Sequence, residues 1–167
     1  ASDTDSIYLN LGPLVCRVFG DSQQSTEKIV ETLDKFCESK IQPFIDKSYQ
    51  ELADYLNAYA QKMQMKRETI ADKGIWTAKK RYILNAWDIE GVRYHEPKMK
   101  IMGIESVKSS TPAFCRDKLT ESFKVIMSGD NDKLIEFIQK IRKNFNQQEL
   151  INISFPRGVN GINKYKG

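Results

Sequence analysis

The stretch "IWTAKKRYILNAWDIEGVRYHEPKMKI", residues 75–101, carries the strongest strand signal in this chain of 167 residues. It divides at Glu90-Gly91 into two runs, residues 75–89 and 92–101, in which β-branched and aromatic residues are frequent. Such residues favour strands, and a two-residue connection that contains glycine favours a hairpin. The stretch therefore predicts two antiparallel strands joined by a tight turn.

Two further strands are predicted upstream of this hairpin. The run "KMQMKRETIA", residues 62–71, reads as a strand that is followed by a short loop at residues 72–74. Near the start of the chain, residues 6–11 are rich in strand formers, and Gly12-Pro13 is expected to stop that strand. Between these two runs the sequence changes its period.

A long amphipathic helix is predicted between the first strand and the sheet. From Ser25 to Leu56, apolar residues recur at every third or fourth position and form one stripe. Pro43 lies inside this pattern and lacks the backbone N–H that a continuous helix needs. The sequence therefore predicts a kink, or two abutting helices, at this position.

The C-terminal third is again helical by its local signals. Thr111-Pro112 is a suitable cap and first residue for one helix, which Ser128-Gly129 ends, and Asp130 can cap another. The tail, residues 151–167, is expected to hold a short strand. Taken together, the elements predict an α+β fold, a small antiparallel sheet with a long kinked helix packed on it, followed by further helices.

Composition limits the function classes. The net charge of +4, from 26 Lys and Arg against 22 Asp and Glu, permits an anionic partner without requiring one. Cys16, Cys37 and Cys115 are scattered, which favours reduced thiols over a disulfide or a metal site. No apolar run approaches the ~18 to 20 residues of a membrane span, and no leader sequence opens the chain. We expect a soluble protein of the cytoplasm, with no membrane partner.

Asp3 and Asp5 form a candidate metal site in "ASDTDSIY". On a strand, side chains two residues apart point to the same face, about 6 to 7 Å apart. Two such carboxylates repel each other unless a cation lies beside them, and Mg²⁺ prefers oxygen ligands. The alternative is a solvated chain end, since Asp130 and Asp132 have the same spacing where a helix cap accounts for them.

Three motifs resemble elements of family B DNA polymerases, and they occur in the same order. "DTDSIY", residues 3–8, resembles motif C, the hairpin turn that supplies a catalytic aspartate. "WTAKKRY", residues 76–82, resembles the KKRY element that grips the primer-template duplex. "EPKMKIMGIESVKSSTP", residues 96–112, is similar to the K-x-x-G-x-E-x-x-K stretch between palm and thumb, in its T-even-type bacteriophage form.

The resemblance implies primer extension from dNTPs with two Mg²⁺ ions in the complete active site. Asp5 matches the essential metal ligand and Asp3 the first aspartate of the motif. Glu68 matches an acidic position near the metals, although Lys66 stands where a further acid is expected. The implied DNA-binding residues are Lys79, Lys80, Arg81, Tyr82, Lys100 and Lys108, with Ser154, Arg157, Lys164 and Lys166 at the start of the thumb.

Strand alternation makes a specific prediction about the KKRY element. If it is one continuous strand, Lys80 and Tyr82 lie on one face and Lys79 and Arg81 on the other. Only one basic pair would then meet a duplex, while the aromatic bulk of the same strand is buried. The alternative is a solvated strand face without a partner.

The resemblance also implies that the chain is part of a larger enzyme. Residues 1–108 would form the C-terminal part of the palm and residues 109–167 the start of the thumb. In the family, motif A and the fingers precede motif C, so we expect an upstream segment as partner, beside primer-template DNA and dNTP, and no activity of this chain alone. Two alternatives remain, a non-catalytic double-stranded DNA-binding module and, disfavoured by the lack of a preceding nucleotide-binding strand–helix unit, a DxD metal-dependent glycosyltransferase.

Overall fold

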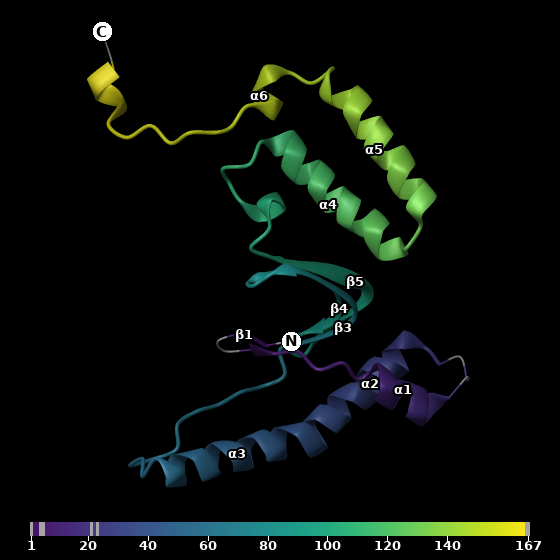
Figure 1. Cartoon of the computed structure of the whole chain (residues 1–167), viewed down its shortest axis with the longest axis vertical. Coiled ribbons are helices and arrows are strands. Elements are labelled where there is room, and N and C mark those ends of the chain that lie inside the picture. Colours follow the sequence, from purple (N-terminus) through teal and green to yellow (C-terminus); the bar gives the residue numbers. More distant parts are fainter. Residues whose placement is uncertain (1, 4–5, 21, 23, 166–167) are drawn as a thin grey trace. The chain divides into compact units, whose positions relative to one another are not determined.

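A computed structural model describes residues 2–3, 6–20, 22 and 24–165 of the chain. The chain forms two compact units, Ala1–Asp72 with Leu84–Met99 and Lys73–Ile83 with Lys100–Gly167. Helices and an antiparallel sheet are both present, so the predicted α+β class is confirmed (Figure 1). Within its described part, the chain contains no helix that combines the length and the apolarity needed to cross a membrane.

The main sheet has three strands in the order of the chain, β3 (Thr69–Ala78), β4 (Arg81–Ile89) and β5 (Val92–Met102). The predicted strand over residues 62–71 is wrong for most of its length. Its partner β4 ends near Glu90, whose N–H donates to the Glu68 carbonyl at 2.6 Å, so earlier residues have no strand to pair with. The predicted loop at residues 72–74 is also wrong, because β3 continues through them and Asn85 donates to Asp72 at 2.7 Å.

Two-residue turns join the three strands and make the sheet antiparallel. The predicted hairpin at Glu90-Gly91 is confirmed. Both residues have positive φ, 52° and 83°, which is the type I′ geometry that follows the twist of the strands. The other turn consists of Lys79 and Lys80, and Lys80 has a φ of 60°. The prediction that KKRY is one continuous strand is therefore wrong, since its first two residues form a turn and Arg81 begins β4.

The N-terminal strand prediction is only partly confirmed. Strands β1 (Ser2–Asp3) and β2 (Ser6–Ile7) pair antiparallel, with Asp3 opposite Ser6. Instead of ending the strand at Gly12-Pro13, the chain begins helix α1 (Gly12–Phe19) there. Proline in a first helical turn loses nothing, because the N–H it lacks would have no intrahelical partner.

The long helix begins and breaks where the sequence predicts. The Ser25 side chain accepts a hydrogen bond from the Lys28 N–H and caps α2 (Thr26–Phe36). A π-helical turn, η1 (Cys37–Ile41), separates α2 from α3 (Gln42–Tyr55), in whose first turn Pro43 lies. The wider π turn accommodates the proline that the α-helical hydrogen-bond pattern excludes.

The π turn also leads to a prediction about thiol chemistry. Burial raises the pKa of the Cys37 thiol, with the Arg67 charge opposing this, whereas Cys16 is exposed. Thiolate is the reactive form, so we expect iodoacetamide near neutral pH to label Cys37 several-fold more slowly than Cys16. Peptide mass spectrometry after timed quenching measures both rates. In denaturant the labelling rates of Cys37 and Cys16 should converge. If the rates still differ there, the difference comes from the local sequence and not from burial of Cys37.

The second unit carries the C-terminal helices. These are η2 (Glu105–Val107), α4 (Ala113–Ser128), α5 (Asn131–Phe145), α6 (Leu150–Ile153) and η3 (Ile162–Tyr165). The Asp130 cap is confirmed, since its side chain accepts from the Lys133 N–H at 3.0 Å. Helix α4 is capped by Pro112, one residue later than the predicted cap at Thr111. The predicted short strand in the tail is wrong, because the apolar residues there form the single helical turn α6.

Each unit has its own small core. In the first unit, Val30 of α2 is buried together with Ile70, Leu84 and Ala86 of the sheet. The core of the second unit comprises Ile83, Ile104, Phe114, Phe123 and Met127. There the Phe114 and Phe145 rings meet edge to face with centroids 5.9 Å apart, and the Lys73 ammonium donates to the Met127 carbonyl at 2.7 Å. The ring contact therefore joins α4 to α5, and the Lys73 hydrogen bond joins α4 to β3.

Candidate nucleic-acid interface

The predicted metal residues are described only in part. The backbone of Asp3 lies in β1, and Asp5 lies outside the described residues, as does the predicted tail residue Lys166. Glu68 immediately precedes β3 and is exposed. No group of three or more His, Cys, Asp or Glu side chains able to hold a metal occurs among residues 2–3, 6–20, 22 and 24–165.

The basic turn, residues 79–82, is the best-defined part of the predicted site. Lys79 and Lys80 are exposed at the β3–β4 turn, whereas Arg81 and Tyr82 are partly buried at the start of β4. The Thr77 hydroxyl donates to the Arg81 carbonyl at 3.2 Å across the turn. The predicted alternation of basic residues between two faces is wrong, because the positive φ of Lys80 takes this residue out of the strand pattern.

A second segment of the same unit packs against this turn. Gly103 has a φ of 66°, and a β-carbon built there would overlap the Lys80 carbonyl oxygen. Glycine is the only residue that combines this φ with so close an approach of two backbones. The glycine of the K-x-x-G-x-E-x-x-K stretch therefore brings that stretch into contact with the basic turn.

Ion pairs of Glu105 link the K-x-x-G-x-E-x-x-K stretch to the basic turn. Its carboxylate pairs through Oε2 with Nη2 of Arg81 and through Oε1 with the Lys108 ammonium, the latter at 3.1 Å. A hydrogen bond from its own backbone N–H, the bond from Lys108 and the Arg81 charge together lower the pKa of Glu105. The carboxylate is ionised at neutral pH and lies between two predicted DNA-binding cations.

The other predicted DNA-binding residues are not gathered at the turn. Lys100 lies in β5 and is partly buried, and Tyr82 is half-buried in β4. Arg157 lies in the irregular segment after α6, and Lys164 lies in η3, both exposed. In the part of the chain that the structure describes, neither of these two cations has an ion-pair partner.

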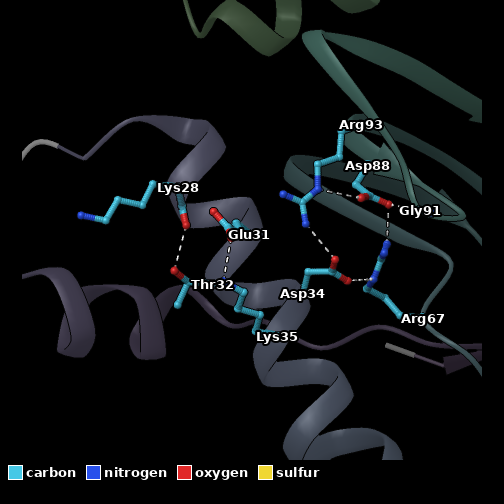
Figure 2. Close-up of polar contacts among 9 residues, drawn as sticks. All are labelled: Lys28, Glu31, Thr32, Asp34, Lys35, Arg67, Asp88, Gly91 and Arg93. Carbon is cyan, nitrogen blue, oxygen red and sulfur yellow. Dashed lines mark hydrogen bonds and ion pairs between the residues drawn. The ribbon is translucent and has the colours of Figure 1, made fainter.

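A four-residue ion network in the first unit was not predicted from the sequence (Figure 2). Arg67 pairs with Asp34 of α2 at 2.8 Å and with Asp88 of β4 at 2.5 Å. Arg93 of β5 pairs with Asp34 at 2.8 Å and approaches Asp88 at 3.6 Å. The Gly91 N–H also donates to Asp88 at 3.0 Å, so the network ties α2 to two strands and to their turn.

Burial makes this network consequential. Asp88 is fully buried, and the Asp34 and Arg67 side chains are each 18 % exposed. Burial disfavours the charged form of Arg67, but the hydrogen bond and the charge of Asp88, with the charge of Asp34, outweigh this and raise the Arg67 pKa. The network holds residue 67, directly before the predicted acidic residue Glu68, against helix and sheet. No local sequence signal marks it, because its members are distributed over residues 34–93.

Comparison with known proteins defines the class. No family model matches the chain. It is 40 % identical over 171 residues, 98 % of its length, to the DNA-directed DNA polymerase of Escherichia phage RB69. It is 36 % identical over 173 residues, 99 % of its length, to the DNA-directed DNA polymerase of Enterobacteria phage T4.

These similarities confirm the resemblance that the motifs indicated. The α+β chain with its basic turn is similar to DNA-directed DNA polymerases, and more particularly to those of T4-type phages. The chain spans 19 % of the length of each of these relatives. The matched region is therefore one segment of each of these relatives.

Proposed function

We propose that this chain is the C-terminal palm segment and thumb start of a family B DNA polymerase that extends a primer from dNTPs. The observation that carries the proposal is 40 % identity over 98 % of the chain to a phage DNA-directed DNA polymerase. The order of the three motifs, at residues 3–8, 76–82 and 96–112, supports it. In this proposal residues 1–108 belong to the palm and residues 109–167 to the thumb, and the enzyme acts in the host cytoplasm.

The proposed metal ligands are Asp5 and Asp3, with Glu68 nearby. The chemistry of this donor set fits, because Mg²⁺ takes one or two protein carboxylates and leaves its remaining positions to phosphate and water. The pairing of β1 with β2 supports a hairpin around the motif. Bound Mg²⁺ would stabilise charge on the attacking and leaving oxygens during nucleotidyl transfer. The carboxylates of this chain hold and orient the ions, and the upstream segment with motif A and the fingers completes the site.

The proposed grip on the primer-template duplex is the basic turn with Lys100 and Lys108. Exposed Lys79 and Lys80 at the tip of a hairpin suit contacts to phosphates, which position a duplex without reading its sequence. Arg81 and Lys108, paired to one carboxylate, add two further donors. Arg157 and Lys164 are proposed to extend the contact along the thumb.

Primer extension tests the catalytic proposal. This chain, mixed with an upstream segment that carries motif A and the fingers, should extend a labelled primer with Mg²⁺ and four dNTPs. Asp5→Ala should abolish extension, because the site loses an essential metal ligand. Asp132→Ala, an exposed aspartate of α5 in the same D-x-D spacing, should leave it unchanged. Extension that survives Asp5→Ala, or fails although the two chains form a stable complex, would contradict the catalytic role.

A second function, duplex binding without catalysis, is favoured by one observation. The basic turn and the segment that contacts it lie within a single unit, so this surface needs no upstream partner to form. For the isolated chain we therefore expect salt-dependent binding to double-stranded DNA in the absence of Mg²⁺. A complex of both chains that binds duplex but never extends a primer would favour this function over catalysis.

A further inference from the structure

One carboxylate in the second unit contacts two of the proposed DNA-binding cations. Glu105 uses a different oxygen for each, Oε2 for Nη2 of Arg81 and Oε1 for Nζ of Lys108. The three side chains are 40 %, 44 % and 48 % exposed in the order Arg81, Glu105 and Lys108, so a duplex can reach them. The guanidinium and the ammonium are thereby held on either side of one anion.

The Arg81 side chain depends on Glu105 for its orientation. Its Nε atom is buried and has no hydrogen-bond partner among the described residues. The ion pair through Nη2 is therefore the contact that orients the guanidinium in the described part of the chain. A planar guanidinium with its orientation set is suited to paired hydrogen bonds to phosphate.

The backbone places Glu105 independently of that pair. Gly103 lies against the Lys80 carbonyl, and Glu105 begins η2 two residues later. The carboxylate is thus attached to a segment that already contacts the basic turn. Its position is not a consequence of the flexible side chains that it holds.

We propose that Glu105 is a positioning residue that holds Arg81 and Lys108 side by side as one phosphate-binding pair. This rests on the proposed duplex grip and assigns to an acidic residue a favourable part in binding an anionic ligand. Simple electrostatics predicts the opposite sign, because removing a negative charge from a basic surface should strengthen DNA binding. The sign of the effect therefore distinguishes positioning from net charge.

The test compares two charge-neutralising substitutions in the full chain. Glu105→Gln removes the anion between Arg81 and Lys108, and glutamine keeps one side-chain acceptor oxygen instead of two. Glu121→Gln is the matched control, because Glu121 accepts from Lys118 three residues away at 2.7 Å and is 48 % exposed. Binding to a short fluorescein-labelled DNA duplex is measured by anisotropy over a series of salt concentrations.

We expect Glu105→Gln to weaken binding about fivefold near 0.15 M salt, the loss of about one phosphate contact, and to lower the salt slope by about one. Glu121→Gln should bind at least as tightly as the unchanged chain. In an Arg81→Ala background, Glu105→Gln should lose most of its effect, because Glu105 then has one cation less to position. Binding by Glu105→Gln that equals or exceeds that of the unchanged chain would overturn the proposal.

A second readout separates this inference from the proposed function. The Nε–H resonance of Arg81 in a ¹⁵N NMR spectrum should be observable in the unchanged chain and weaken by solvent exchange in Glu105→Gln. If the unchanged chain fails to bind duplex, the proposed grip is refuted, and this resonance alone decides whether Glu105 orders Arg81. A resonance that the substitution leaves unaltered would refute the positioning role even if the duplex binds.

Discussion

Asp88→Ala is expected to lower the free energy of unfolding of the first unit by about 3 kcal/mol. Asp88 is fully buried and accepts from Arg67 at 2.5 Å and from the Gly91 N–H at 3.0 Å. Its removal leaves Asp34 as the only anion of the network beside two guanidinium groups. Removing one partner of a buried ion pair is costly because the remaining charge stays desolvated.

The chain offers both a probe and a control for this measurement. Each unit contains one of the two tryptophans, Trp87 in the first and Trp76 in the second. In a Trp76→Phe background, the fluorescence of Trp87 in urea reports on the first unit. Asp72→Ala is the control on neighbouring strand β3, because Asp72 is exposed and accepts a hydrogen bond from Asn85. We expect this substitution to change the free energy of unfolding by no more than about 0.5 kcal/mol. Equal effects of the two substitutions would show that the network does not stabilise the unit.

Gly103→Ala is expected to destabilise the second unit by about 3 kcal/mol. Alanine is strained at a φ of 66°, and its β-carbon would overlap the Lys80 carbonyl oxygen. A backbone oxygen in a two-residue turn cannot move aside as the end of a flexible side chain does. The basic turn and the segment from Gly103 to Lys108 would have to separate.

Gly129→Ala measures the cost of placing alanine at a positive φ without a close contact. Gly129 ends α4 in the same unit with a φ of 76°, and a β-carbon there meets nothing within 4 Å. We therefore expect it to cost only about 1 kcal/mol. In a Trp87→Phe background, the fluorescence of Trp76 in urea reports on both variants. If the two substitutions cost the same, the close contact with Lys80 contributes nothing to stability.

The residue types of the candidate site stay a prediction, whereas the geometry that the sequence predicted for them is wrong in part. The motif order indicated Lys79, Lys80 and Arg81 as DNA-binding residues, and the structure places all three at one end of a hairpin. The predicted distribution of these residues over two strand faces is wrong, because Lys79 and Lys80 form a turn where the sequence predicts a strand. A sequence of high strand propensity gives no sign that a lysine adopts positive φ, since that depends on where the neighbouring strand pairs.

The contacts of Glu105 could likewise be predicted only in part from the sequence. Within the motif it stands as one acidic residue among basic ones, and its sequence position predicts contact with Lys108 three residues away at most. Its second contact, with Arg81, spans 24 residues and depends on the approach of Gly103 to the turn. The proposed positioning role of Glu105 could therefore be inferred only from the tertiary structure.

The sequence by itself determined the α+β class, the break of the long helix near Pro43, the hairpin at Glu90-Gly91 and the Asp130 cap. Each of these depends on interactions within a few residues, which the local sequence encodes. Only the tertiary structure decided the Lys79-Lys80 turn, the Arg67–Asp88 network and the pairing of Glu105 with Arg81. These features depend on contacts between segments that are distant in the sequence. Burial of apolar surface over the whole chain determines such contacts more strongly than local propensity does.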